Sequence, residues 1–315
     1  MGRVERFAGV WHIRIVIPFF VFLFGLVFGS FLNVCISRIP EGLSVVSPGS
    51  RCPCCLTPIK PYDNIPVVGW LMLRGKCRTC GLPISPMYPI VEFLTGLLFA
   101  LALREFGLTL ATLKWMVFSC LIVVLVVTDL RVRILPDLVN FPGMVAGLLF
   151  SLGTPVLDTT ATTLYVLTYR RLPFSLSWMV VSLLNAVLGA ILGSFLLWGA
   201  AKVYKLVRKK EGMGMGDVKM MAMVGAFLGP RGAFLTILLG TLLGSVTGLG
   251  WIALLYLAGW KRKVAERAAR RGLGSVANIR WSLASQYQLP LGTFLGIGAL
   301  SVVYGFPWLD SILPG

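Results

Sequence analysis

Two aspartates stand where apolar segments begin or end, positions at which a carboxylate is costly. Asp129 follows "CLIVVLVVT", and Asp217 lies between "GMGMG" and another apolar stretch, in a chain with only 12 acidic residues. Acidic groups at such depth usually face a cavity or a partner. Two carboxyl groups held close together share a proton, so the pair can deprotonate water and protonate an amide product. The pattern indicates a catalytic dyad, Asp129 and Asp217, that titrates as one unit.

Each aspartate also has a simpler explanation when it is taken alone. Asp217 can cap the N-terminus of a helix, because aspartate is common there and negative charge is favoured. Asp129 can be an interface charge that pairs with Arg131 or Arg133. The catalytic interpretation rests on the two residues lying on the same side of a membrane.

The residues around Asp217 support access by a peptide. Gly212, Gly214 and Gly216 allow positive φ angles and close backbone approach, which an extended substrate needs. Histidine chemistry is disfavoured, because the one histidine, His12, is predicted on the opposite side of the membrane. No phosphate-binding loop or dinucleotide fingerprint occurs, so nucleotide chemistry is disfavoured too.

A second constellation is a pair of cysteine knuckles. They are Cys52-x-x-Cys55 and Cys77-x-x-Cys80, separated by 21 residues. Four thiolates at this spacing suit a closed, tetrahedral, structural Zn²⁺ site, and in a reducing compartment disulfides are disfavoured. Cys54 could replace Cys55 as a ligand, although the two-residue spacing favours Cys55. The loop is too short for much of a core, so metal binding should supply its folding energy.

The elements that hold these groups are membrane helices. The chain is 57% hydrophobic and 13% charged, whereas soluble domains carry about 25% charged residues. Apolar runs approach the roughly 20 residues that cross a bilayer as helix. The sequence predicts an all-α polytopic membrane protein with about eight spans, near 15–37, 86–104, 109–128, 138–154, 177–201, 217–229, 232–258 and 288–306. The sixth is short and abuts "LGPRG", so it is expected to be tilted or only partly inserted.

The basic residues predict the orientation. The net charge is +17, and we attribute it to membrane orientation and not to nucleic acid. Loops near 38–85, 129–137, 202–219 and 260–284 hold 21 of the 29 lysines and arginines. The positive-inside rule places these loops in the cytoplasm, and both termini outside it. Asp129 and Asp217 then lie on the same, cytoplasmic side.

Taken together, these segments resemble the bacterial prepilin peptidases, also called type IV leader peptidases, which are membrane aspartic proteases of the GxGD type. The resemblance covers most of the chain. It is carried, in order, by "FGSFLNVCISRIP", the paired-cysteine loop with "YDNIPVVGWLMLRGKCRTCG", "ISPMYPIVEFLTG", "TDLRVRILPD", "GMGMGDVKMMAMVGAFLG" and "LPLGTFLGIGA". Each segment alone is modest evidence for the family, but the order and spacing of the segments together are specific to it.

The resemblance implies a function. Asp129 and Asp217 would cleave the basic leader from prepilins and pseudopilins, usually after a glycine, at the cytoplasmic face of the bacterial inner membrane. Members with a cysteine loop often methylate the new N-terminus as well, using S-adenosylmethionine. The sequence shows no methyl-donor pocket; Glu92, inside an apolar span, is a candidate for polar contacts in that half or a structural carboxylate. The implied organisation is a first helix (1–37), a zinc-binding loop (38–85) and a protease core (86–315).

The chain departs from the family pattern at Cys54, at an insertion near 155–176, and at Thr293, where many relatives have proline. We expect neither Cys54 nor Thr293 to touch the chemistry.

Three alternatives compete. A protease of the presenilin kind shares the GxGD aspartate, but its Pro-Ala-Leu sequence is absent. A transporter with buried acids, or a non-catalytic secretion scaffold, would leave the cysteine loop and the dyad without a joint explanation.

Overall fold

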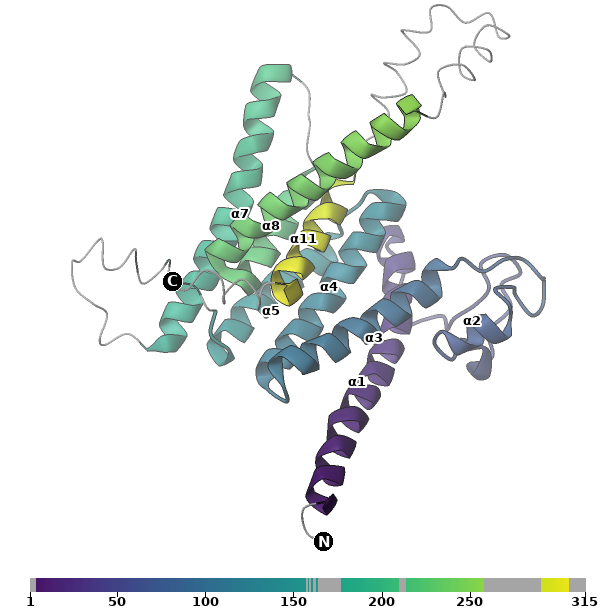
Figure 1. Cartoon of the computed structure of the whole chain (residues 1–315). Coiled ribbons are helices and arrows are strands. Elements are labelled where there is room, and N and C mark those ends of the chain that lie inside the picture. Colours follow the sequence, from purple (N-terminus) through teal and green to yellow (C-terminus); the bar gives the residue numbers. More distant parts are fainter. Residues whose placement is uncertain are drawn as a thin grey trace, which may run out of the picture.

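The structure is a bundle of helices with one small loop module beside it (Figure 1). This computed structural model describes residues 4–156, 158, 160, 163, 177–209, 214–257 and 290–305. The helices are α1 (Val4–Arg38), α2 (Val68–Met72), α3 (Met87–Phe106), α4 (Leu110–Val132), α5 (Asp137–Gly153), α7 (Trp178–Arg208), α8 (Met215–Leu257) and α11 (Leu291–Gly305), with short 3-10 turns η1 (Ile39–Glu41) and η2 (Pro61–Asn64). Within the described residues there is no strand, only two isolated bridges. The predicted all-α class is confirmed.

Five helices of the described part are long and apolar enough to cross a bilayer: α1, α3, α4, α7 and α8. The predicted spans 138–154 and 288–306 correspond to α5 and α11, which are apolar but shorter than 18 residues. The number of crossings, eight by sequence, therefore stays a prediction. The predicted loop 260–284, Gly212 and most of the insertion near 155–176 lie outside the described residues.

The predicted sixth and seventh spans form one helical element, α8, which reverses direction at Gly229. Gly229 has φ 77° and ψ −179°, and Pro230 follows it. Met221 O and Ala233 Cβ both lie within 3.4 Å of the position that a Cβ on Gly193 would occupy. Twelve residues of straight helix span about 18 Å, so the two arms must fold back against each other along α7. Glycine is required at the turn because its φ is in the left-handed region.

The turn of α8 is closed by the start of the insertion. The carboxylate of Asp158 accepts a hydrogen bond from the backbone N–H of Arg231, at 2.8 Å, just after the reversal. The same aspartate is tied to α7, because Asn185 Nδ2 donates to its carbonyl oxygen at 2.6 Å. Aspartate at the start of a helix satisfies a free N–H group and favours the positive end of the dipole.

The centre of the bundle is α4, which contacts α1, α3, α5 and α11. Its Phe118, Ile122 and Leu125 are fully buried, spaced by the three to four residues that place side chains on one helix face. The first arm of α8 adds the fully buried Met220 and Met223. Both aspartates stand at ends of these packed elements, so the core fixes their positions.

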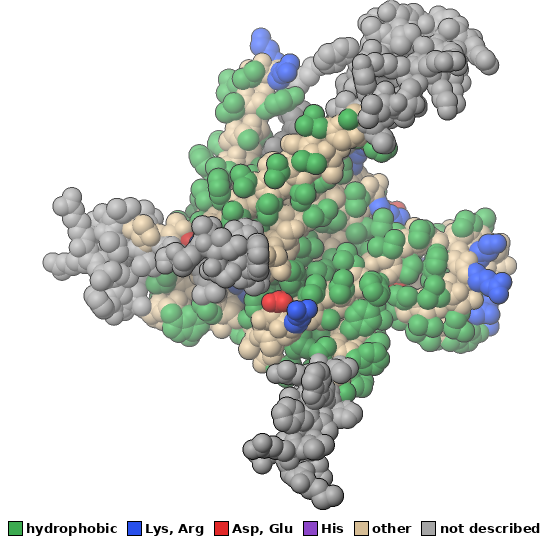
Figure 2. All heavy atoms as spheres, viewed as in Figure 1, with side chains coloured by type: hydrophobic (Ala, Val, Ile, Leu, Met, Phe, Trp, Pro, Cys, Tyr) green, Lys and Arg blue, Asp and Glu red, His purple; other side chains and the backbone are tan. Residues whose placement is uncertain are grey.

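The outer surface is largely apolar, as expected for a protein surface that contacts lipid. Figure 2 shows apolar side chains over most of the visible face, with lysines and arginines gathered at the far end of α7 and on the rim of the cysteine loop. Large apolar residues such as Phe20 and Phe195 are more than half exposed. In water such exposure would be unusual, but in a bilayer apolar atoms are already solvated.

Candidate active site

The two aspartates come together at one end of the bundle. Asp129 lies in the last turn of α4 and Asp217 in the first turn of α8. Both are buried, with 6% and 8% of their surface exposed. A Cβ placed on Gly292, at the start of α11, would lie 3.1 Å from Asp129 Oδ2 and 3.1 Å from Asp217 Oδ1. The two carboxylates thus face the same position, where any side chain on residue 292 would lie, and glycine leaves that position empty.

Thr293 holds one oxygen of this pair. Its backbone N–H donates to Asp129 Oδ2 at 2.7 Å, and its hydroxyl donates to the same oxygen at 2.9 Å. Hydrogen bonds to an ionised group are about twice as strong as neutral ones. The carboxylate of Asp217 has the backbone of Gly214 as its hydrogen-bond partner, so the two aspartates are held by different segments of the chain.

A cavity of about 270 Å³ opens onto both carboxylates. Leu135 forms one wall, and its side chain also packs at Gly216 and Gly292. The other lining residues come from the α4–α5 connection and the start of α8: Arg133, Ile134, Asp137 and Gly214. Asp137 is paired with Lys219, with Nζ 2.7 Å from Oδ2. This volume holds several waters and part of a peptide.

The geometry bears on the simpler explanation of each aspartate. In the described part of the chain, Asp129 makes no ion pair with Arg131 or Arg133 and is held by Thr293 instead. Asp217 is the third residue of α8, where the dipole favours a carboxylate, but its side chain also faces Asp129 across Gly292. Asp217 can therefore cap the N-terminus of α8 and also pair with Asp129.

Two expectations at this site are wrong. Neither Gly214 nor Gly216 has a positive φ; their contribution is the absence of a side chain, at the cavity lining and against Leu135. Thr293 does touch the proposed chemistry, through Asp129. A sequence cannot show this, because the two residues are 164 positions apart; the one signal was that Thr293 lies in a segment carrying the family resemblance.

The four predicted metal ligands also converge. The Sγ atoms of Cys52, Cys55, Cys77 and Cys80 all lie within 4.8 Å of one another. Cys52 and Cys80 are separated by 3.8 Å, and Cys55 and Cys77 by 4.0 Å. Tetrahedral Zn–S bonds of about 2.3 Å place sulfurs about 3.8 Å apart, so the cluster fits that metal.

Both knuckles have the same local structure, which explains why the spacing was readable from sequence. The N–H groups of Cys52 and Cys77 donate to the carbonyls five residues on, and the residues four positions on donate back to the cysteine carbonyls. That fourth position has a positive φ in each knuckle, at Leu56 and Gly81. Cys54 is exposed and outside the cluster, so the geometry favours Cys55 as the ligand.

Together, the fold and the sites define a helical membrane protein with a paired-aspartate centre and a four-cysteine module. The chain matches the model of the bacterial peptidase A24 N-terminal domain over residues 23–106 and that of the type IV leader peptidase family over residues 115–249. The chain belongs to the type IV leader peptidase family.

Three of its relatives carry the name "Prepilin leader peptidase/N-methyltransferase". The protein of Klebsiella pneumoniae is 39% identical over 228 residues, covering 70% of this chain and 90% of that protein. The protein of Myxococcus xanthus is 37% identical over 230 residues, covering 73% and 62%. The protein of Aeromonas hydrophila is 36% identical over 258 residues, covering 74% and 81%. No solved structure matches the chain.

Proposed function

We propose that this protein is an aspartic endopeptidase that removes the basic leader from type IV prepilins and pseudopilins, and then methylates the new N-terminus. The observation that carries the first activity is the convergence of Asp129 and Asp217 on one cavity. Family membership and the name shared by the relatives support both activities. A transporter or scaffold would not need this convergence.

The dyad supplies the chemistry of cleavage. A water between Asp129 and Asp217 loses a proton to one carboxylate while its oxygen attacks the peptide carbonyl. The proton on the other carboxyl group then passes to the leaving amine, and the C–N bond breaks. Thr293 keeps Asp129 oriented toward the water, and either carboxyl group can act as the acid or the base.

The substrate is expected to reach this centre from the bilayer. Pilin-like precursors continue beyond the leader as an apolar helix, which already resides in lipid. The dyad lies at the ends of membrane helices, and its cavity is bordered by the connection between α4 and α5. We place this end at the cytoplasmic face of the bacterial inner membrane, in line with the distribution of basic residues.

The cysteine module is assigned a structural role. Cys52, Cys55, Cys77 and Cys80 would hold Zn²⁺, which supplies folding energy to a loop with little core of its own. All four positions of a tetrahedral ion are then filled, so the metal has no open site for a substrate. The module anchors to the helices through Arg38, whose guanidinium donates to three loop carbonyls, those of Ser44, Pro48 and Gly49.

The second activity needs S-adenosylmethionine, which supplies an electrophilic methyl group when bound. The chain must then present the new N-terminal amine as a free base, exclude competing water and keep the amine near the donor. The amine is formed at the dyad, so the donor must be held on the same membrane side. Prepilin or pseudopilin precursors and the lipid bilayer are the partners of this function; nucleic acid is not.

The proposal is tested with purified protein in detergent and a prepilin-type substrate, with products read by mass spectrometry. The expected products are the free leader and a mature chain, which gains one methyl group when S-adenosylmethionine is added. A substrate with valine in place of the glycine before the cleavage site is the control and should remain intact. Cleavage of both substrates alike, or of neither, would contradict the proposal.

A further inference from the structure

The short helix α2 of the cysteine loop turns apolar side chains outward. Val68, Leu71 and Met72 are 46%, 60% and 71% exposed. Their spacing of three and four residues places them on one side of the helix, and we call them the apolar face of α2. Single exposed apolar residues are common on proteins, whereas a contiguous group marks a contact surface. The apolar face of α2 is therefore a candidate contact surface.

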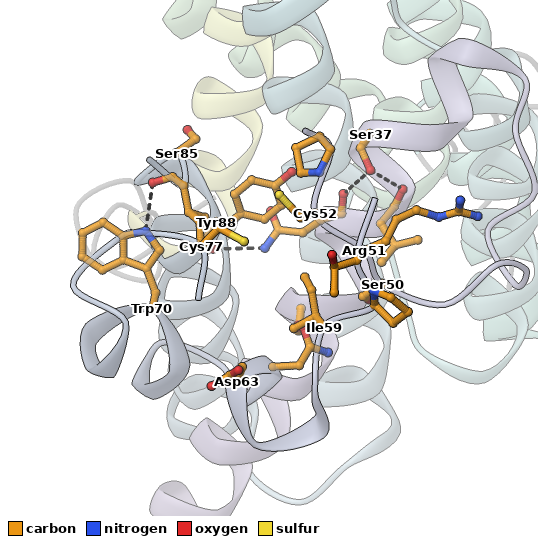
Figure 3. Close-up of a pocket in the computed structure, with 18 of the residues that line it drawn as sticks. Ser37, Ser50, Arg51, Cys52, Ile59, Asp63, Trp70, Cys77, Ser85 and Tyr88 are labelled. Carbon is orange, nitrogen blue, oxygen red and sulfur yellow. Dashed lines mark hydrogen bonds between the residues drawn. The ribbon is translucent and has the colours of Figure 1, made fainter. Parts of the chain in front are cut away.

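The opposite side of α2 packs into the loop and fixes the orientation of the helix. A Cβ on Gly69 would overlap the carbonyl oxygen of Asp63, so the two backbones are in close contact there. The indole N–H of Trp70 donates to the carbonyl oxygen of Ile84 at 3.1 Å, a bond drawn beside Ser85 in Figure 3. With these contacts in place, the apolar face cannot turn inward.

The apolar face is separate from the large cavity of the cysteine loop. That cavity has a volume of about 1420 Å³, and Trp70 is among the residues that line it (Figure 3). Val68, Leu71 and Met72 do not line it. The apolar face therefore lies on the outside of the loop, where it can meet only the surroundings of the protein.

A hydrogen bond places the start of α2 at membrane depth. The backbone N–H of Val67, the residue before α2, donates to Glu92 Oε2 at 2.7 Å. The helix α3 has 20 residues, about the number that crosses the hydrocarbon core, so its first residue, Met87, lies near the membrane boundary. Glu92 is five residues further on, which is about 7.5 Å along the helix axis. The start of α2 is thus held beside the span and not in the water beyond it.

The helix α3 meets lipid at this same level. Ile90 and Phe93 stand on either side of Glu92 in the sequence, and both side chains are more than half exposed. In Figure 1, α2 lies lower in the view than the first turn of α3, in the direction in which α3 descends into the bundle. The apolar face of α2 therefore lies at a depth where the neighbouring helix already exposes apolar side chains to lipid.

Two basic residues follow the apolar face. Arg74 and Lys76 come two and four residues after Met72, and both are exposed. Neither forms an ion pair with another residue in the described part of the chain, whereas Arg78 is paired with Asp63. Figure 2 shows the basic side chains of the loop along its outer rim. Apolar side chains beside lysine and arginine are typical of helices that lie in a membrane interface with anionic lipid.

We propose that α2 is an interfacial anchor: its apolar face inserts into the cytoplasmic leaflet of the bilayer, and Arg74 and Lys76 bind anionic phospholipid headgroups. The bilayer is the partner because the bond to Glu92 holds α2 at lipid depth, and because the basic pair is complementary to anionic headgroups. The contact fixes the cysteine loop against the membrane, although the sequence predicts that the whole loop is cytoplasmic. The proposal depends on the orientation proposed above only for the choice of leaflet.

Photolabelling of the unmodified protein in liposomes tests the contact without any variant. The probe is a phospholipid with a diazirine on its acyl chain, which on irradiation labels residues that touch lipid. Mass spectrometry should find label within 68–72 as well as in α3, which serves as the internal standard. Label in α3 without label in 68–72 would overturn the proposal and assign the apolar face to a protein partner.

Charged substitutions test which residues make the contact. Leu71→Asp and Met72→Asp should each lower the label in 68–72, relative to α3, by at least about fivefold. Val46→Asp is the matched control, because Val46 is an exposed apolar residue of the same loop outside α2, and its label should stay within about twofold. A thermal melt checks that each variant is folded. Unchanged label in both α2 variants, or an equal loss in the control, would overturn the proposal.

Lipid charge tests the role of the basic pair. Liposomes of phosphatidylglycerol should give at least about threefold more label in 68–72 than liposomes of phosphatidylcholine, and the double variant Arg74→Gln, Lys76→Gln should remove this difference. Equal labelling of the unmodified protein in the two lipids would overturn the assignment to anionic headgroups.

The choice of leaflet is tested separately with Cys54, which is exposed on the same loop. In spheroplasts, a membrane-impermeant thiol reagent should leave Cys54 unmodified, because the loop faces the cytoplasm. Modification there would overturn the orientation proposed above, whereas label in 68–72 in liposomes would still support the contact between α2 and lipid.

Discussion

Replacing Thr293 with valine tests how the dyad is held. Valine has nearly the same shape but lacks the hydroxyl that donates to Asp129 Oδ2 at 2.9 Å. The backbone N–H at 2.7 Å remains, so the carboxylate keeps one of its two donors. Thr293 is 4% exposed, so water cannot easily replace the lost donor.

The size of the effect follows from that single bond. A hydrogen bond to a charged group contributes about 1.5–3 kcal/mol, and the remaining N–H and a shift of the carboxylate recover part of it. We expect a loss of about 1–2 kcal/mol of transition-state stabilisation, which is a fall in kcat of about 5- to 30-fold. KM should change little, because the hydroxyl of Thr293 is buried and bonds to the carboxylate of Asp129.

The assay is steady-state cleavage of a prepilin-type substrate in detergent. Thr293→Ser keeps the hydroxyl and should retain activity within about threefold of the unmodified enzyme. Thr247→Val is the matched control, because this exposed hydroxyl bonds to the backbone of α8. A Thr293→Val enzyme with unchanged kcat, or one whose loss appears only in KM, would refute the view that Thr293 orients Asp129.

Three further predictions concern the scaffold. Chelation should disorder the cysteine loop, seen as faster amide exchange over 50–85, before the membrane helices unfold; a protected loop without metal would contradict the assignment. Gly225→Ala should lower the unfolding free energy by about 1–3 kcal/mol, because the added Cβ would meet the backbone of Gly189 on α7. Gly199→Ala is the control, because a Cβ there has nothing within 4 Å. In a thermal melt this control should be neutral or stabilising. Asp158→Ala should cost about 1 kcal/mol in the same melt by removing the cap of the second arm of α8; an unchanged midpoint would show that the cap contributes nothing.

Local patterns account for what the sequence could predict. The knuckles are set by short-range hydrogen bonds around Cys52 and Cys77, so spacing alone was enough to find the ligands. Hydropathy located the apolar segments, because a helix in lipid must be apolar along its length. The positions of Asp129 and Asp217 at helix ends followed from the same pattern.

The parts that sequence reasoning missed depend on contacts between distant segments. Thr293 meets Asp129 only because α11 packs against α4. Glu92 meets Val67 because the cysteine loop folds back onto α3. The sequence placed a break near "LGPRG", but the close return of the second arm of α8 along α7 depends on Gly193 and its neighbours. Hydropathy carries no information about which helices touch.

The central claim is that Asp129 and Asp217 together activate water. Its most direct test is the turnover number of Asp129→Asn and of Asp217→Asn with a prepilin-type substrate, with Glu105→Gln as the acid-to-amide control. Each dyad variant should lose at least about 1,000-fold in kcat while keeping its metal content and melting temperature, and the control should keep full activity. Cleavage within a few-fold of normal by either dyad variant would contradict the account.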